Sequence, residues 1–339
     1  MAYAKHTLGT HVEFRNWKWV HDTIDKPNFI PDQLASHPLL VFISTTVCDG
    51  PKDTLSIQNF YEKIRFIAMQ HGNMRVYPNA LEMQQAHLKI GDIRALDIIA
   101  KQSPERFRFR PETCFGNRSC ALLGEGSQSV VKKSHSCGGN GVEVVTIEEA
   151  RNKVGCRDMK RRRTGIRPDS GIAQVGPRNP LLLHQEYIAT LQSFGEFRVF
   201  LQAPPDPTSE AKIIAIARTK FEELGGKMVA RHIRKTDFNW AGEDEESWQE
   251  KEAELCDFAR HIYTHLCARL DANEVYESLK IGVRLDIGIS VLGPGGRFFV
   301  NEITRWHSAD FFSMDILRYP FLEICEGYSA AWSAFLCKL

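Results

Sequence analysis

The chain has 339 residues, with 43 lysines and arginines against 42 aspartates and glutamates, for a net charge of +1. This balance argues against nucleic acid as the main partner, because nucleic-acid-binding proteins normally carry a dominant basic surface. The length predicts two or three domains or lobes. No run of 18 apolar residues is present, so no membrane-spanning helix is expected.

The pattern of cysteines indicates in which cellular compartment the protein is expected. Nine cysteines are scattered along the chain, and none of them forms a CxxC pair. Such usage is typical of reduced thiols, and the N-terminal residues contain no apolar segment of signal-peptide length. The sequence therefore predicts a cytoplasmic protein with no membrane partner.

The first hundred residues alternate between strand and helix signals. Apolar runs at 38–44 and 74–79 predict strands, and helical spacing predicts a helix over 59–72. Residues 80–102 have a helical pattern that only Gly91 interrupts. The segment is therefore expected to form one helix, or two helices if Gly91 breaks it. Strand, helix, strand, helix predicts an α/β lobe with parallel pairing.

The rest of the chain continues with strands and two helices. The expected strands are 129–133, 141–147, 181–188, 196–203, 212–220, 281–290 and 297–305. A short helix is expected over 147–155, and an amphipathic helix over 246–270. The last two strands are joined by "VLGPGG", which is a hairpin signal.

A strand that ends in two lysines leads into a glycine-rich loop, in the stretch "VVKKSHSCGGNGV". Glycines allow the backbone to approach an anion and to direct N–H groups at it, and a lysine adds a point charge for phosphate. The stretch is not a Walker A loop, because the lysines precede the glycines. The alternative is an exposed lysine pair beside an ordinary hairpin loop.

Two carboxylates lie on neighbouring strands of the last predicted hairpin. Asp286 and Glu302 each interrupt an otherwise apolar strand, where a carboxylate is costly unless it is paired or binds a metal. Alternation places Arg284 on the face of Asp286, and Glu302 on one face with Asn301 on the other. This predicts an oxygen-ligand site for Mg²⁺ beside phosphate. The alternative is a structural Arg284–Glu302 salt bridge.

Taken in order, five motifs over residues 75 to 312 resemble the ATP-grasp enzymes: "AHLKIGDIRAL", "VVKKSHSCGGNGV", "LLLHQEYI", "GEFRVFL" and "RLDIGISVLGPGGRFFVNEIT". The resemblance implies an α/β (α+β) fold in which two α+β lobes clamp a nucleotide beside an N-terminal α/β lobe. It implies an N-terminal domain at 1–105, a lid subdomain with the glycine-rich loop at 106–185, and a subdomain with the magnesium hairpin at 186–339.

The resemblance also implies ligand contacts. For ATP these are Lys89, Lys132, Gly138, Gly139, Gly141, Glu186, Tyr187, Ile188 and Glu196. For Mg²⁺ they are Asp286, Glu302 and Thr304. The family usually has asparagine two residues after the metal glutamate, and this chain has Thr304 there, which puts a second metal in doubt.

ATP-grasp resemblance implies ligation of a small-molecule carboxylate to an amine or thiol, through an acyl phosphate. Arg284 is then expected to stabilise the oxyanion. The segment "EFRVFL…IIAIARTK", followed by "MVARHIR", is similar to the glutamate-adding ligases, and the whole pattern is similar to D-alanine–D-alanine-like ligases. This makes Arg218, Arg231 and Arg234 candidates for binding phosphate or a substrate carboxylate. The alternatives are a kinase and an ATP-binding assembly chaperone of a translation factor, which would bind a protein partner.

Overall fold

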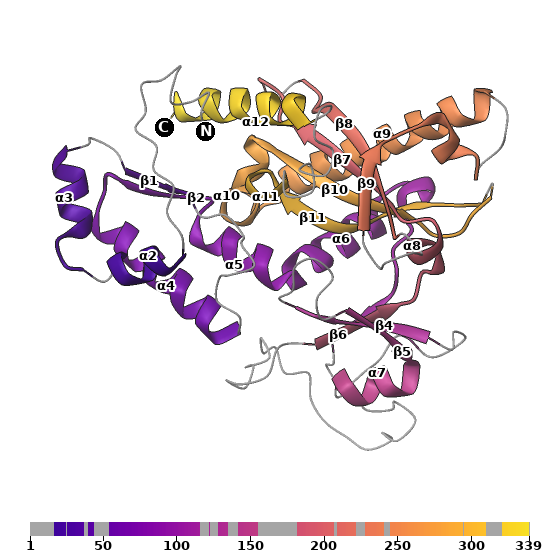
Figure 1. Cartoon of the computed structure of the whole chain (residues 1–339), viewed down its shortest axis with the longest axis horizontal. Coiled ribbons are helices and arrows are strands. Elements are labelled where there is room, and N and C mark those ends of the chain that lie inside the picture. Colours follow the sequence, from indigo (N-terminus) through magenta and orange to yellow (C-terminus); the bar gives the residue numbers. More distant parts are fainter. Residues whose placement is uncertain are drawn as a thin grey trace.

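The computed structural model describes residues 17–24, 26–36, 40–43, 54–115, 122, 128–134, 142–154, 182–206, 209–221, 228–240, 245–293, 295–309 and 321–338. Figure 1 shows an N-terminal part at one side of a large sheet and a smaller sheet below that large sheet. Helices and sheets are mixed, which confirms the predicted α+β class. No helix within the described ranges is long and apolar enough to cross a membrane.

The N-terminal part is built on two parallel strands. Strand β1 (Leu40–Ile43) pairs with β2 (Met74–Tyr77), and α4 (Thr54–Gln70) connects them. A crossover helix is the usual way to join parallel neighbours, so the predicted parallel pairing is confirmed. Buried side chains of α4 pack with Met83 of the next helix. Helices α2 (Trp17–Ile24) and α3 (Phe29–Ser36) complete this part.

Two helices follow, α5 (Ala80–Leu88) and α6 (Ile90–Gln102). Asn79 caps the first, because its side chain accepts hydrogen bonds from the backbone N–H groups of Leu81 (3.0 Å) and Glu82 (3.1 Å). The expected division of this segment is confirmed, but it falls at Lys89 rather than at Gly91. A 3₁₀ turn, η1 (Glu105–Phe107), then leads out of α6.

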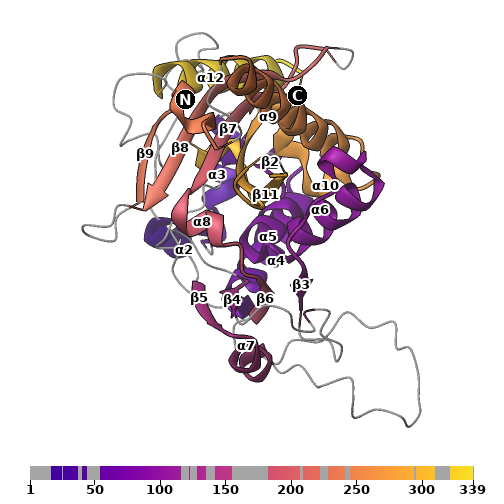
Figure 2. The ribbon, with the colours of Figure 1, turned by 90° about the vertical axis from the view of Figure 1, so that its right-hand side faces the viewer.

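A four-stranded antiparallel sheet forms the smaller layer. Its order is β3 (Thr113–Cys114), β6 (Leu182–Glu186), β4 (Gln128–Lys133), β5 (Val142–Thr146). Helix α7 (Ile147–Val154) lies on the side of this sheet that is turned away from the large sheet, as Figures 1 and 2 show. The other side of the small sheet is turned toward the large sheet.

The large sheet has five antiparallel strands. Its order is β11 (Phe298–Arg305), β10 (Gly282–Ile289), β7 (Glu196–Gln202), β8 (Lys212–Phe221), β9 (Met228–His232). One face packs against α9 (Glu245–Cys267) and α6, with Phe197, Leu285 and Phe258 among its fully buried members. This is the main core, and it explains the apolar alternation in these strands.

The opposite face of the large sheet carries polar side chains at the alternate positions. Helices α11 (Trp306–Ala309) and α12 (Phe321–Leu336) cover one end of it, where Phe200 packs with Ile324 and Tyr328. Figure 1 shows α12 above the sheet and the four-stranded sheet below it. The remaining short elements are α8 (Ala189–Ser193), η3 (Lys235–Phe238), α10 (Ala272–Val275) and η4 (Glu277–Lys280).

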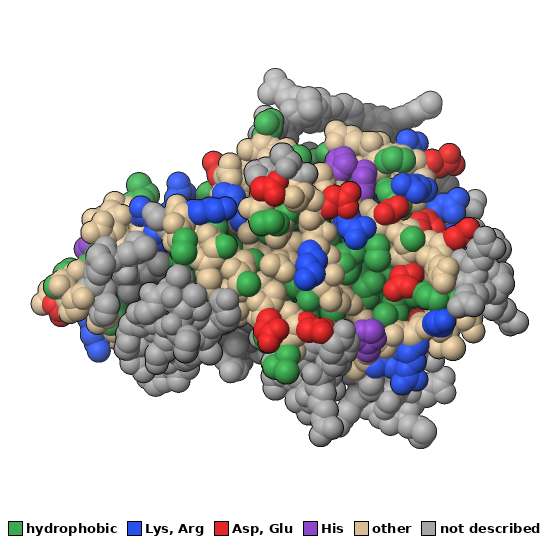
Figure 3. All heavy atoms as spheres, turned by 90° about the horizontal axis from the view of Figure 1, so that it is seen from above, with side chains coloured by type: hydrophobic (Ala, Val, Ile, Leu, Met, Phe, Trp, Pro, Cys, Tyr) green, Lys and Arg blue, Asp and Glu red, His purple; other side chains and the backbone are tan. Residues whose placement is uncertain are grey.

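The surface reflects the balanced composition. In Figure 3, acidic and basic side chains are interspersed over the described part of the face seen from above. A mixed surface of this kind fits the near-zero net charge.

Candidate functional site

Lys132 links the two sheets. It lies on β4 of the small sheet, and its ammonium donates to Gln185 Oε1 (2.9 Å) and to Asn301 Oδ1 of the large sheet (3.2 Å). Burial lowers the pKa of Lys132 to about 8, with a further contribution from nearby Lys89. Lys132 is partly buried, and the two side chains that accept from its ammonium group, Gln185 and Asn301, are uncharged amides.

Asn301 reaches this cation because β11 contains a bulge. The register pairs Asp286 with Glu302 and then Ile287 with Val300, so Asn301 is an extra residue in its strand. Its amide donates to Glu196 Oε2 (3.1 Å) while its oxygen accepts from Lys132. The prediction that Asn301 points to the face opposite Glu302 is therefore wrong, since a bulge interrupts strict alternation.

Glu302 faces Lys89. Their Nζ and Oε1 atoms lie 2.9 Å apart, with 27% of the lysine and 42% of the glutamate side chain exposed. Burial alone raises the pKa of Glu302, but Lys89, followed by Arg284 and Lys132, outweighs it and lowers the pKa. The carboxylate is thus held ionised at the edge of the cleft, within reach of solvent.

Asp286 is held by two guanidinium groups. Arg284 donates from Nε to Oδ1 (2.7 Å) and from Nη2 to Oδ2 (2.9 Å), and Arg198 Nε lies 3.8 Å from Oδ1. Arg284 Nη2 also donates to Thr304 Oγ1 (3.0 Å), and Nη1 donates to the Ala309 carbonyl (3.3 Å). Arg284 and Asp286 therefore share a face, as alternation predicted, and Arg284 is fixed on several sides.

Glu196 lies next to this pair on β7. Its Oε1 is 3.5 Å from Arg198 Nη2, and burial, followed by Asp286, raises the pKa of Glu196. Sequence reasoning missed Arg198, although its position two residues after Glu196 on one strand was a sufficient signal. It also missed Gln185, for which the sequence offered only its place in "LLLHQEYI".

Glu186, Tyr187 and Ile188 connect the two sheets. Glu186 ends β6, where its backbone N–H donates to the Glu112 carbonyl (2.8 Å), and the chain then enters α8 and β7. The Tyr187 hydroxyl donates to Gln192 Oε1 (2.8 Å). The segment therefore lies at the junction of the small and the large sheet. Gly138, Gly139 and Gly141 lie outside the described residues.

The structure does not bring Arg218 and Arg231 together with the other candidates. Arg218 is paired across the sheet with Phe197, whose side chain is in the main core, so it lies on the face opposite Glu196. Both arginines contact Asp237, which is fully buried; one of these contacts, Arg231 Nη1 to Asp237 Oδ2, is 2.7 Å. The backbone N–H of Arg234 donates to the same carboxylate (2.8 Å).

The oxygen groups fit a magnesium ion in part. Glu302 and Asp286 are direct cross-strand partners, and carboxylate oxygens are preferred Mg²⁺ ligands. Glu302 fits well because it is exposed and is paired with a lysine at the cleft edge. Asp286 and Thr304 fit only if Arg284 releases some of their oxygens.

Neither a protein-family model nor a curated protein matches the sequence. Solved structures do: D-alanyl-alanine synthetase A from Vibrio cholerae is 11% identical, with a TM-score of 0.44 over 85% of this chain and 72% of that one. D-cycloserine synthetase DcsG is 15% identical, with a TM-score of 0.45 over 82% and 78%. A RimK domain ATP-grasp protein from Sphaerobacter thermophilus is 14% identical, with a TM-score of 0.39 over 80% and 76%.

These three likenesses are all distant. Their TM-scores lie below 0.5, and their identities do not exceed 15%. The contacts inside the cleft, rather than these likenesses, therefore carry the functional argument.

Proposed function

We propose that the chain is an ATP-dependent ligase that joins a carboxylate to an amine or thiol, with ATP bound between the two sheets. The observation that carries this proposal is the meeting of Lys132 and Lys89, from separate elements, with Asn301 and Glu302 of one hairpin. Ammonium groups opposite carboxylates, across a cleft between two layers, suit a polyphosphate accompanied by a divalent cation.

In this proposal the walls of the cleft have different roles. Lys132 and Lys89 bind phosphate oxygens, and each releases its present partner on the hairpin as the nucleotide enters. The backbone of 186–188 contacts the adenine and Glu196 the ribose, in line with the family resemblance. The glycine loop covers the phosphates. Preorganised cations of this kind supply most of the stabilisation in phosphoryl transfer.

Magnesium, when bound with ATP, would offset charge on the phosphates as phosphoryl transfer proceeds. Glu302 is the ligand we propose first, and Asp286 and Thr304 would join it where Arg284 releases their oxygens. The movement of Lys89 to the phosphates would free Glu302 for this role.

The proposed reaction has two steps. The substrate carboxylate attacks the γ-phosphate, forming an acyl phosphate and releasing ADP. The amine or thiol then attacks the acyl carbon, and inorganic phosphate leaves as the new bond forms. Arg284 stabilises the oxyanion of the second step, because its contacts to Asp286 Oδ1 and to the Ala309 carbonyl hold the guanidinium when Nη2 releases Asp286 Oδ2 and Thr304.

An ATP-binding assembly chaperone of a translation factor is the second candidate. One observation favours it: the guanidinium of Arg284 engages both oxygens of Asp286 and the hydroxyl of Thr304. If that arrangement persists with nucleotide bound, fewer oxygens are left for metal ligation, and ATP binds without turnover.

The test is release of ADP and phosphate from Mg-ATP in the presence of pooled amino acids and small carboxylic acids, with mass spectrometry of the products. Asp286→Asn is compared with Asp257→Asn, a matched change at an aspartate of α9 that is 53% exposed. A ligase gives substrate-dependent ADP release that is lost only in Asp286→Asn, and a product one water lighter than its parts. A product heavier by a phosphoryl group indicates a kinase, and binding without turnover in any pool favours the chaperone.

A further inference from the structure

Lys89 lies at a one-residue elbow between α5 and α6. Its backbone angles are φ 54° and ψ −20°, in the left-handed region. Its N–H donates to the Gln85 carbonyl (2.9 Å), and its own carbonyl accepts from the Ile93 N–H (3.0 Å), so it ends one helix and begins the next. Residues other than glycine rarely adopt this conformation, and they keep it only where the surroundings enforce it.

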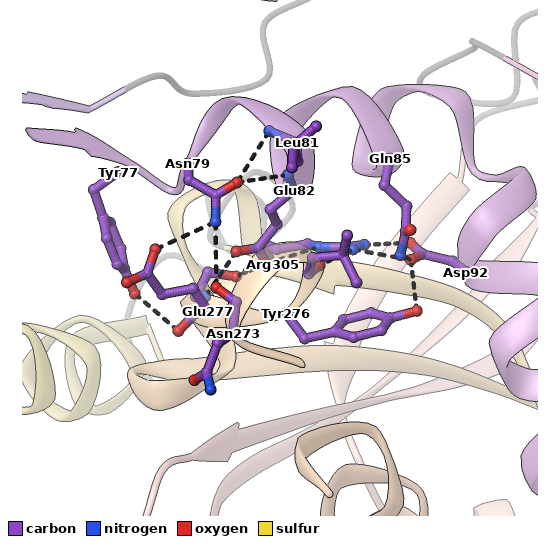
Figure 4. A network of polar contacts seen from close by, with 12 residues as sticks. Tyr77, Asn79, Leu81, Glu82, Gln85, Asp92, Asn273, Tyr276, Glu277 and Arg305 are labelled. Atoms are coloured by element: carbon purple, nitrogen blue, oxygen red, sulfur yellow. Dashed lines mark hydrogen bonds and ion pairs between the residues drawn. The ribbon is translucent and has the colours of Figure 1, made fainter. Parts of the chain in front are cut away.

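A buried polar network contacts both helices that meet at this elbow, α5 and α6. We call it the Arg305 clamp: Glu82 on α5, Asp92 on α6, Arg305 on β11, and Tyr276 and Ser278 next to them. Figure 4 shows Arg305 lying between the two carboxylates. Its Nη2 donates to Asp92 Oδ1 (2.9 Å) and its Nε to Glu82 Oε1 (3.4 Å), while Nη1 binds Asp92 Oδ2. Arg305 is the one cation among the five clamp residues. Its guanidinium therefore joins the carboxylate of α5 to the carboxylate of α6.

Each carboxylate of the clamp has further partners. Ser278 donates to Glu82 from its hydroxyl (2.6 Å) and from its backbone N–H (2.9 Å). The Tyr276 hydroxyl donates to Asp92 Oδ1 (3.1 Å). Glu82 is completely buried and Arg305 is 2% exposed. A buried network with these partners has little freedom to rearrange, so it fixes the angle between α5 and α6.

Gly91 allows a direct bridge across the elbow. Gln85 Nε2 on α5 donates to Asp92 Oδ1 on α6 (3.0 Å). A Cβ atom at position 91 would come within 2.5 Å of the Gln85 side chain. Gln85 can therefore reach Asp92 only because residue 91 has no side chain, which gives this glycine a role in the elbow although it does not break the helix.

We propose that Arg305 is a positioning residue that holds Lys89 in place for the phosphates of ATP, an inference that rests on the proposed function. Arg305 follows Glu302 by three residues on β11, and Lys89 Nζ lies 2.9 Å from Glu302 Oε1. The strand that carries the acidic side of the cleft thereby also sets the position of the lysine that faces it. The clamp fixes the backbone conformation of Lys89. That conformation in turn directs its ammonium group toward Glu302.

The first measurement is hydrogen–deuterium exchange of the amides of Lys89 and Ile93, which needs no nucleotide. Arg305→Lys keeps the charge but loses the forked geometry that binds two carboxylates. Arg260→Lys is the matched control, because Arg260 pairs with Glu210 (3.6 Å) and Asp257 (3.9 Å), neither of which belongs to the clamp. Exchange at the elbow is expected to rise by about tenfold in Arg305→Lys and to stay unchanged in the control. Unchanged exchange in both variants would overturn the proposal.

The second measurement is a double-mutant cycle on the affinity for Mg-ATP. Arg305→Lys is expected to weaken binding by about tenfold in the wild-type background, and to have no further effect once Lys89→Met has removed the ammonium. Equal losses in both backgrounds would mean that Arg305 acts only through general stability, and the proposal would fail. If Arg305→Lys does not fold, Gly91→Ala replaces it in both measurements, because it displaces Gln85 and leaves every charge in place.

The two proposals fail in different ways. If the wild type does not bind Mg-ATP, the proposed function is wrong, and the exchange measurement still decides whether the clamp holds the elbow. If the wild type binds Mg-ATP and the cycle is additive, the positioning role of Arg305 is wrong while the proposed function stands.

Discussion

Two arginine–aspartate clusters lie on opposite faces of the same five-stranded sheet. On the cleft face, Arg284 binds both oxygens of Asp286. On the core face, Arg218 and Arg231 bind Asp237. The clusters use the same chemical groups, and the aspartate of each is buried, so we compare what surrounds each cluster.

In the core-face cluster the shared carboxylate of Asp237 is fully buried, while Arg231 is 34% exposed. Arg218 donates to the Phe194 carbonyl (2.7 Å) and lies 3.8 Å from the centre of its ring, and Asp237 caps a 3₁₀ turn. The cleft-face cluster instead adjoins Glu302, which is 42% exposed and is paired with a lysine at the cleft edge. We infer that the Asp237 cluster supports the fold. The Asp286 cluster lies beside the partly exposed Lys89–Glu302 pair, and it is therefore the one suited to binding a ligand.

The largest expected effect is on stability at the core face. Asp237→Ala leaves two guanidinium groups without their carboxylate, and it is expected to lower the free energy of unfolding by about 3 kcal/mol. Denaturant unfolding measures this loss. Mg-ATP affinity per folded molecule is expected to stay the same, so a parallel loss of affinity would break the proposed division between the faces.

A smaller effect is expected from Lys132 on the cleft side. Lys132→Met removes a cation that we assign to phosphate, so Mg-ATP binding is expected to weaken by about thirtyfold, or roughly 2 kcal/mol. The free energy of unfolding is expected to change by less than about 1 kcal/mol, because burial already disfavours this charge. Calorimetric titration and denaturant unfolding on one preparation separate the two effects, and a large loss of stability with normal binding would contradict the assignment.

Arg218→Lys tests whether the core-face cluster contributes to stability or to catalysis. Lysine keeps the charge but loses the hydrogen bond to the Phe194 carbonyl and the stacking on its ring, so a loss of about 1 kcal/mol in stability is expected. The rate of substrate-dependent ADP release per folded molecule is expected to be unchanged. A tenfold or greater fall in that rate at normal stability would restore Arg218 as a catalytic candidate.

The smallest expected effect is one of pH. The pKa of Lys132 is lowered to about 8, so its ammonium is charged below that pH and becomes neutral above it. Phosphate binds the charged form, and the affinity for Mg-ATP is therefore expected to fall as the pH rises above about 8. Lys132→Arg keeps its charge throughout and is expected to lose this dependence. A pH profile that is the same in both proteins would rule out Lys132 as its source.

The sequence was sufficient where strand periodicity alone decides the outcome. Asp286 and Glu302 face each other as expected, since they lie on two strands joined by a hairpin. It was not sufficient for Asn301, because a bulge is not visible in an apolar pattern. The sequence analysis assigned no face to Arg218, since the face depends on the register of its strand with the neighbouring strands.

The elbow at Lys89 shows another limit of sequence reasoning. Gly91 was the natural place for a break, since glycine is the residue that most readily leaves helical geometry. Instead the left-handed residue is Lys89, which lies between two helices that Arg305 joins through Glu82 and Asp92. Local propensity was overridden by the buried network around it.

The most direct test of the account compares Asp286→Asn with Asp237→Asn, two identical changes in similar clusters on opposite faces. Stability by denaturant unfolding and substrate-dependent ADP release per folded molecule are measured for both. We expect Asp286→Asn to lower the rate by about a hundredfold or more, and Asp237→Asn to lower stability more while keeping the rate. A normal rate in Asp286→Asn, with the loss in Asp237→Asn instead, would contradict it.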